Sequence, residues 1–302
     1  MIDAPGVYDL DAATYFADPC PTPSLSASIA AVLISKTPMH AAFLHKRLNP
    51  DFEESDDSKF DFGNAMHAAL LGGARLAVIP FDSYRSKAAQ EARDGAWARR
   101  SVPVLPEQLE RVQAACRAVW RHLSEHRECS EALSKGRPEQ TLIAREGRVW
   151  IRVKLDWLPE LTVPGKKRLA FYDLKTTTDA NPDVWTRRLF EIGADVQSAL
   201  YRRVIRTVLG IENPIFRFVV AEAKPPHGVS VVELDPAAVD LADRKVETAI
   251  RIWDRCLEAG KWPGYPPVVH HVAAPAWQQQ KFEDRVLRKQ TLEELGVEYF
   301  GL

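Results

Sequence analysis

The sequence predicts a protein of the α/β (α+β) class, in which a mixed central sheet is flanked by helices and preceded by a helical N-terminal portion. Three observations support this prediction. Helix start and stop signals dominate the first 135 residues, an alternation of apolar and polar residues begins after Gly136, and strand patterns then alternate with helix patterns. The chain has 302 residues, 46% hydrophobic and 27% charged, which is enough for a large buried core.

The N-terminal portion contains several helix start signals. Residues 1–23 show no periodicity, so we expect an irregular arm there. Ser26 or Ser28 can cap a short helix through Leu33, and Thr37-Pro38 begins a helix expected to reach about Leu48. Further helices are expected from Gly63 to Leu71 with a stop at Gly72-Gly73, in the helix-rich region 85–135, and within it most clearly from Pro106 to about His122.

Two strands with one buried face are expected after Gly136. Residues 149–156 alternate between apolar and polar side chains, and a second strand runs from about Arg168 to Thr176. Pro164-Gly165 is a strong turn dipeptide between them. If the chain folds back there, Asp156 and Asp173 become cross-strand neighbours with Cβ atoms about 5 Å apart.

The remaining sequence alternates between helix and strand. We expect a helix over 195–209 that ends at Gly210, strands over 215–220 and 229–234, and a long helix over 236–257. The chain then divides into an irregular arm (1–23), a helix-rich part (24–135) and a core with a C-terminal helix and tail (136–302).

The overall charge gives no general attraction to nucleic acid. The chain has 40 basic and 41 acidic residues, so DNA binding would need a local patch. Residues 141–210 hold 13 Lys and Arg against eight Asp and Glu, a balance of +5. In this stretch Arg187, Arg188, Arg202 and Arg203 are candidate DNA contacts, although a solvated surface explains them equally well.

The cysteines and the hydropathy exclude several classes. The four cysteines are scattered, which predicts buried reduced thiols rather than a disulfide framework or a clustered zinc or iron–sulfur site. We find no apolar run long enough to cross a membrane and no signal-peptide pattern, so a cytoplasmic protein without a membrane partner is expected.

The predicted pair of Asp156 and Asp173 is the candidate binding site for a metal ion. Two adjacent carboxylates repel each other unless a cation or a shared proton compensates them. Mg²⁺ prefers hard oxygen ligands and often binds one or two carboxylates together with substrate phosphate. Lys175 lies on the same strand face as Asp173, where an ammonium group can steer an attacking water and offset developing negative charge. The alternative interpretation is an ion pair on an edge strand.

Gln197 and Tyr201 lie four residues apart on the helix expected over 195–209, so they share one face of it. An amide and a hydroxyl there can contact a phosphate or order a water at the metal. A half-buried polar stripe is the alternative.

These motifs follow one another along the chain: Gly63-x-x-x-His67, Lys154-Leu-Asp156-Trp-Leu, Asp173-Leu-Lys175-Thr-Thr and Gln197-x-x-x-Tyr201. Their order resembles the PD-(D/E)xK nuclease superfamily, whose fold is restriction-endonuclease-like. Within it the chain is most similar to the RecE (exonuclease VIII) exonuclease domain, a relative of lambda exonuclease and the RecB nuclease domain. The resemblance covers about residues 24–280. Leu155 replaces the usual Pro, and Asp173 stands where many relatives have Glu, but neither change removes an oxygen ligand.

The resemblance implies a role for each motif residue. Asp156 and Asp173 would bind Mg²⁺, for which Mn²⁺ can substitute, with help from the Leu174 carbonyl. His67 and Glu139 would be further ligands. Lys175 would position the nucleophilic water, and Gln197 and Tyr201 would support the scissile phosphate.

The resemblance also implies an activity and partners. The expected activity is exonuclease action on linear double-stranded DNA by two-metal hydrolysis, in recombination or phage-type DNA processing. The expected partners are double-stranded DNA ends, a single-strand annealing recombinase and further copies of the chain in a ring.

Other interpretations stay open. A protein of this fold can bind DNA ends or a recombination partner without cleaving DNA. His122-Leu-Ser-Glu-His126 matches the pattern of inverted zincins, although it lies at an expected helix end and we identify no third ligand. The acidic stretch 51–57 is either a solvated loop or a cation site.

Overall fold

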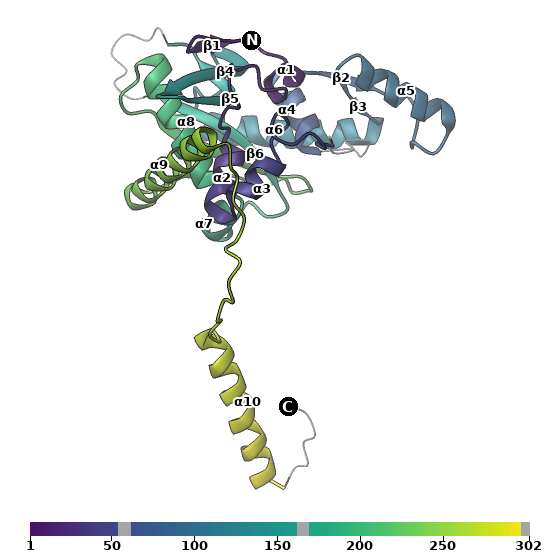
Figure 1. Ribbon diagram of the computed structural model, residues 1–302. Coiled ribbons are helices and arrows are strands. Elements are labelled where there is room, and N and C mark those ends of the chain that lie inside the picture. The colour runs from purple at the N-terminus through teal and green to yellow at the C-terminus, as the bar shows by residue number, and fades with distance from the viewer. Residues whose placement is uncertain (54–61, 162–168, 297–302) are drawn as a thin grey trace. The chain divides into compact units, whose positions relative to one another are not determined.

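Three sheets organise the structure, a computed structural model that describes residues 1–53, 62–161 and 169–296 (Figure 1). The first sheet has the order β1–β4–β5 and is antiparallel, and β2 and β3 form a parallel pair. The third has the order β6–β7–β8, with β6 parallel and β8 antiparallel to β7. The strands are β1 (Gly6–Tyr8), β2 (Arg75–Val78), β3 (Ser101–Val104), β4 (Gly136–Glu146), β5 (Val149–Pro159), β6 (Ala170–Thr177), β7 (Ile215–Glu222) and β8 (Val229–Glu233).

Helices occur along the whole described chain and confirm the mixed α+β class. They are α1 (Ala12–Phe16), α2 (Ala27–Ser35), α3 (Pro38–Phe43), α4 (Phe62–Leu71), α5 (Lys87–Ala98), α6 (Pro106–Glu125), α7 (Pro182–Glu191), α8 (Ala194–Leu209), α9 (Pro236–Ala259) and α10 (Ala276–Glu294). The chain separates into two units, residues 1–264 and 265–302.

Both faces of the β6–β7–β8 sheet are covered. Phe216 and Phe218 of β7 belong to a hydrophobic core with α2, α8 and α9, whereas Val219 belongs to a second core with α4 and α6. Because successive side chains of a strand point to opposite faces, Asp173 shares the α8 face of β6 with Phe171, and Leu174 shares the α4 face with Tyr172. The sheet therefore has helices on both sides, with Asp173 on the side of α8 and Leu174 on the side of α4.

Several expected helix ends are confirmed. The Ser26 hydroxyl accepts the backbone N–H of Ile29 and caps α2. Helix α4 is followed by Gly72 at φ +74°, and α8 ends at Gly210 at φ +68°. These are left-handed backbone conformations, which glycine adopts at little cost. All four cysteines are free and buried, as predicted.

The N-terminal 23 residues are not an irregular arm. Strand β1 pairs with β4 in antiparallel register from Gly6↔Ile143 to Tyr8↔Thr141, and the Asp11 side chain caps α1. Tyr15 and Cys20 are buried. The prediction was wrong because a strand of three residues and a helix of five are too short to show periodicity.

The strand pairing predicted for Asp156 and Asp173 was also wrong. Strand β5 forms its hairpin with β4, through a two-residue turn that Gly147 begins at φ +59°. Strand β6 instead pairs in parallel with β7, although it lies beside β5. The dipeptide Pro164-Gly165 lies outside the described residues, as does most of the acidic stretch 51–57.

Helix α3 is shorter than expected and ends at Phe43 rather than near Leu48. Two residues later His45 is almost fully buried, with Nε2 3.3 Å from Asp18 Oδ2 and 3.1 Å from the Ser24 carbonyl oxygen. Tertiary contacts of His45 therefore override the local helix signal. In the expected helix-rich region, residues 101–104 form β3 between α5 and α6.

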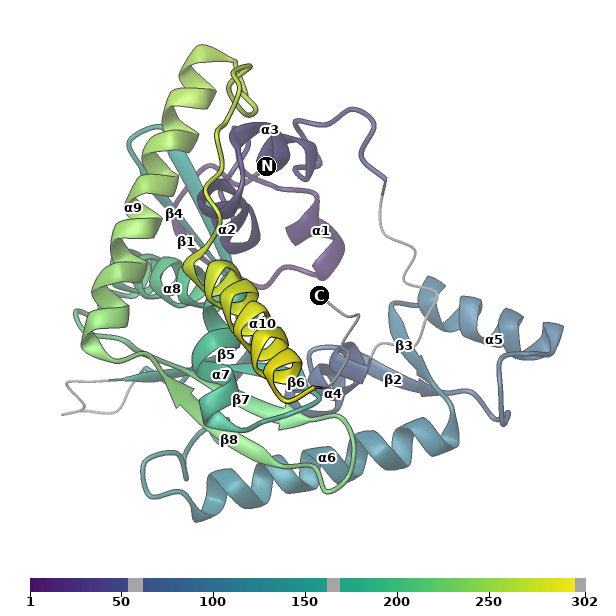
Figure 2. The ribbon, with the colours of Figure 1, turned by 90° about the horizontal axis from the view of Figure 1, so that it is seen from below.

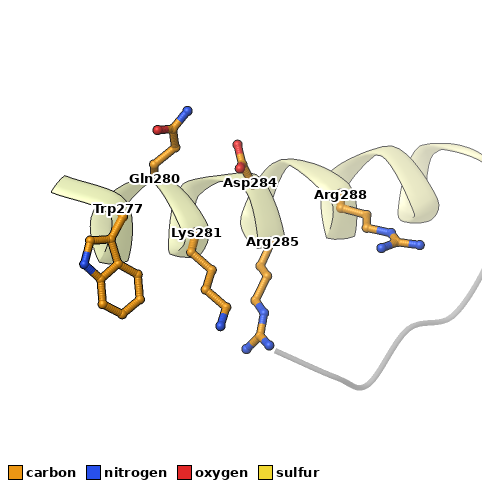
Figure 3. A pocket seen from close by; sticks show the side chains of 6 residues that line it. All are labelled: Trp277, Gln280, Lys281, Asp284, Arg285 and Arg288. Carbon is orange, nitrogen blue, oxygen red and sulfur yellow. The ribbon is translucent and has the colours of Figure 1, made fainter. Parts of the chain in front are cut away.

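The second unit consists of residues 265–302, with α10 as its regular element. Figure 3 shows the side chains that line a shallow depression on α10, namely Trp277, Gln280, Lys281, Asp284, Arg285 and Arg288. No residue of α10 is buried, and Trp277 is 60% exposed. A search of the described helices finds none with the length and apolar character that a bilayer crossing requires.

Candidate active site

Asp156 and Asp173 meet where β5 passes β6. The backbone N–H of Leu174 donates a hydrogen bond of 2.7 Å to Asp156 Oδ2, which ties the first carboxylate to the strand that carries the second. Both aspartates lie in the interior, with side-chain exposures of 13% and 4%. The expected closeness is therefore present, although a hairpin does not produce it.

Glu139 faces Asp156 across the β4–β5 pair. The neighbouring pairs Pro138↔Trp157 and Gln140↔Leu155 fix this register. Glu139 has φ +54°, an uncommon conformation for a residue with a side chain. Its Oε2 lies 2.5 Å from Lys154 Nζ, so the lysine compensates the Glu139 charge.

His67 reaches the same place from α4. Its Nε2 is 3.1 Å from the Leu174 carbonyl oxygen. A carbonyl can only accept, so Nε2 carries the proton, and in the neutral ring Nδ1 keeps a lone pair. Nδ1 lies 3.6 Å from Asp156 Oδ2 and 4.0 Å from Glu139 Oε1. The Leu174 carbonyl oxygen thus orients the His67 ring. The resemblance implied instead that this carbonyl oxygen helps to bind the metal ion.

The donor atoms of His67, Glu139 and Asp156 fit a divalent cation. One ligand atom from each residue lies within 4.8 Å of the other two. Burial, and next the charge of Asp173, raise the pKa of Asp156 to about 7. A divalent cation would restore the charged form, since it offsets both causes. Carboxylates with one imidazole suit Mn²⁺ and Mg²⁺ more than the softer metals that select thiolates.

Asp173 lies beside this cluster and has two partners. Lys175 Nζ is 2.5 Å from its Oδ2, and the Gln197 amide donates a hydrogen bond of 2.5 Å to its Oδ1. Lys175 is one-quarter exposed, so its ammonium reaches solvent at the edge of the site. Gln197 is thus held by the carboxylate rather than open to a phosphate.

Tyr201 has a structural contact in this site. Its hydroxyl donates a hydrogen bond of 2.9 Å to the Lys154 carbonyl oxygen of β5. Burial is the main cause that raises the pKa of Tyr201 well above its usual value, so the hydroxyl keeps its proton. Tyr201 therefore fixes α8 against the strand that carries Asp156.

The four candidate DNA-binding arginines do not form one patch. Arg202 is buried and bonds to Asp243, and Arg203 makes two hydrogen bonds to Glu146. The expectation that Arg202 contacts DNA was wrong, because its guanidinium is used inside the protein. Arg187 pairs with Glu191 on the exposed face of α7, and Arg188 lies over the Trp185 ring.

The zincin alternative gains no support from the described part of the chain. His122 and His126 lie near each other at the end of α6, with ring centroids 6.3 Å apart. Within residues 1–53, 62–161 and 169–296, the search for three mutually close metal-binding side chains yields the cluster of His67, Glu139 and Asp156, and not this pair.

Gly73 is a site residue that the sequence interpretation missed. A β-carbon there would collide with Cγ of Glu139. We expect Gly73→Ala to displace Glu139 and to lower the affinity for Mn²⁺ by about tenfold, the lower end of the effect of disturbing the surroundings of a metal site. Isothermal titration calorimetry measures this affinity.

Gly95→Ala is the matched control for this substitution, because in α5 the added carbon would meet only the flexible end of Arg99. Equal Mn²⁺ affinities for Gly73→Ala and the wild type would contradict the place assigned to Glu139.

Comparisons with known proteins agree with this geometry. Residues 33–270 match the model of the family DUF3799, described as a PDDEXK-like domain of unknown function. No curated protein matches the chain. The fold is similar to the crystal structure of a candidate exonuclease from Eubacterium rectale, with a TM-score of 0.57 and 12% sequence identity over 89% of this chain and 96% of that one. At this identity the structural similarity supports the fold.

Proposed function

Since the chain belongs to the DUF3799 family of PDDEXK-like domains, we propose that it is a metal-dependent deoxyribonuclease that degrades linear double-stranded DNA from its ends. The family places it in the PD-(D/E)xK nuclease superfamily. The observation that carries the proposal is the cluster of His67, Glu139 and Asp156 next to the pair of Asp173 and Lys175. The similar structure from Eubacterium rectale, described as a candidate exonuclease, supports the same class of reaction.

The residues at the site divide the work of phosphodiester hydrolysis. His67, Glu139, Asp156 and Asp173 would hold Mg²⁺ or Mn²⁺. The bound cations supply Lewis-acid polarisation of the phosphate and make water a stronger nucleophile. Lys175 orients the attacking water in line with the departing oxygen and stabilises the negative charge that grows on the phosphate.

Contacts around these residues keep them in position. The Leu174 backbone holds Asp156 through its N–H and His67 through its carbonyl. The Gln197 amide fixes the Asp173 carboxylate at 2.5 Å. Such preorganisation reduces the rearrangement required when DNA binds.

The biological setting that we propose follows the RecE-like motif order. The substrate would be double-stranded DNA ends produced in recombination or in phage-type DNA processing, in the cytoplasm. A single-strand annealing recombinase would take up the single strand produced, and a homo-oligomeric ring would retain the duplex between cleavage steps.

A plasmid assay tests the proposed activity. In the presence of Mg²⁺ or Mn²⁺, linear plasmid should be degraded and should release acid-soluble nucleotides, whereas covalently closed plasmid should remain intact. A chelator should stop the reaction. Protein with Asp173→Asn, purified in the same way, controls for contaminating nucleases. If linear duplex is bound but not degraded with either cation, the protein is a DNA-end-binding protein instead, and the nuclease proposal fails.

A further inference from the structure

A small subdomain extends from the rest of the first unit. It consists of β2, α5 and β3, residues 75–104, and it projects away from the β6–β7–β8 sheet in both views (Figures 1 and 2). It has its own hydrophobic cluster of Ile79, Ala96 and Leu105 with partly buried neighbours. We call residues 75–104 the arm. Its strands also pack against the second core, to which Val104 belongs, so the substitutions that leave that core intact are those at exposed positions of the arm.

The arm begins at the candidate active site. Helix α4 carries His67, and the chain then passes Gly73, whose α-carbon lies against the Glu139 side chain. Two residues later Arg75 opens β2. The start of the arm is therefore at the rim of the metal-ligand cluster.

Parallel pairing brings three arginines to that rim. Arg75 is in register with Ser101, the first residue of β3, and Arg99 and Arg100 directly precede Ser101. Both strands run in the same direction, so these side chains gather at the end of the arm where β2 begins. We call Arg75, Arg99 and Arg100 the arginine edge.

The arginine edge is available to a ligand. All three residues are exposed. Arg100 pairs with Asp11 at the surface, an interaction worth little in water. Arg75 and Arg99 form no ion pair or hydrogen bond through their side chains with residues 1–53, 62–161 or 169–296. The whole arm contains six basic and three acidic residues, so its charge is positive.

We propose that the arginine edge binds backbone phosphates of duplex DNA next to the cleaved bond, an inference that rests on the proposed nuclease function. Phosphate is the anion repeated along that substrate, and guanidinium groups bind it with two parallel hydrogen bonds. The 12 residues of α5 extend the arm by about 18 Å. At 3.4 Å per base pair, this corresponds to about five base pairs of duplex. The arm is therefore long enough to lie along about five base pairs of duplex that leave the rim of the metal-ligand cluster.

Binding of a 30-base-pair duplex, measured by fluorescence anisotropy in chelator between 50 and 200 mM salt, tests the proposal without cleavage. The double variant Arg75→Gln/Arg99→Gln removes two phosphate contacts. The slope of log Kd against log salt should then fall by about 2, because each contact contributes about 0.9. We also expect the affinity at 100 mM salt to fall about tenfold.

Arg251→Gln/Arg255→Gln on α9 is the matched control. It removes the same charge from exposed positions on a helix that lies on the opposite side of the unit from α5 in both views (Figures 1 and 2). This control should leave the salt slope unchanged. An equal loss in both variants would overturn the proposal, since the effect would then reflect overall charge.

The outcomes separate this inference from the nuclease proposal. Wild-type protein that binds duplex through the arginine edge but never cleaves it would support the inference and refute the nuclease. Wild-type protein that cleaves DNA, while the arm variant keeps both affinity and salt slope, would refute the inference alone. An arm that serves an acidic protein partner would give this second result.

Discussion

Replacing Lys175 with alanine is expected to lower the rate of DNA cleavage by at least about a hundredfold, the effect of losing one preorganised electrostatic group. The Lys175 ammonium lies 2.5 Å from Asp173 Oδ2 and is partly exposed. Its Nζ also lies over the Phe218 ring, 5.7 Å from the ring centroid. Removing the side chain thus eliminates a charge that is already aimed at the reaction site, and a quench-flow assay on a short duplex measures the loss.

Two additions separate a catalytic role of Lys175 from a structural one. Ethylammonium in the buffer should restore part of the activity of Lys175→Ala, because it can occupy the vacated space, whereas tetramethylammonium has no N–H group and should not. Lys36→Ala, at an exposed position after α2, serves as the matched control. Unchanged cleavage by Lys175→Ala would remove this lysine from the mechanism.

The place of Glu139 shows what a sequence can predict when the right turn is recognised. The segment Glu146-Gly147-Arg148-Val149 contains a two-residue hairpin turn, with Glu146 paired to Val149. Counting back from this turn brings Glu139 opposite Asp156. The sequence interpretation expected no strand before Gly147 and took Pro164-Gly165 as the hairpin turn, so it did not bring Glu139 opposite Asp156.

The pairing of β6 with β7 could not be predicted by such counting. Parallel strands need a long crossover, here the segment with α7 and α8, and no turn residue fixes their register. What the sequence does determine is the set of groups on α8. Gln197 and Tyr201 share a helix face, and the structure uses both, one on Asp173 and the other on the β5 backbone. Helix periodicity depends only on local sequence, so the prediction that Gln197 and Tyr201 share a helix face stayed correct although the predicted strand pairing was wrong.

Tertiary contacts also decided which basic residues face solvent. Arg202 and Arg203 lie in a stretch of positive charge, yet Asp243 and Glu146 neutralise them from distant positions in the chain. The arginine edge has fewer charges but keeps them exposed. Local charge counts identify a basic segment, whereas the pairing of each guanidinium depends on the fold.

Asp156→Asn is expected to have two opposite effects, a loss of cleavage of at least about a hundredfold and a gain in stability of the metal-free protein. The loss follows from removing a charged ligand of the cation cluster. The gain follows from the burial and the Asp173 charge that raise the pKa of Asp156 to about 7. Asparagine keeps an oxygen that can accept the Leu174 N–H but carries no charge. We expect a melting temperature at least about 2–4 °C higher at pH 7.5, which corresponds to about 1 kcal/mol.

The stability gain of Asp156→Asn should depend on pH in one direction. The folded-state pKa of Asp156, about 7, lies above the ordinary pKa of 3.8 of an unperturbed aspartate. Between these values the folded wild type therefore binds more protons than the unfolded chain, and its stability falls as the pH rises. The difference in melting temperature between variant and wild type should thus be small near pH 4, grow through pH 7, and then level off.

Calorimetry in chelator at several pH values measures this difference, and Asp82→Asn, at an exposed position of the arm, controls for the loss of a surface carboxylate. Added Mn²⁺ should reverse the order of stability, since a cation bound at the cluster favours the charged Asp156 and stabilises the wild type more than the variant. The assignment of Asp156 as a metal ligand would be contradicted if the difference in melting temperature did not grow with pH. It would also be contradicted if the variant stayed more stable than the wild type in Mn²⁺.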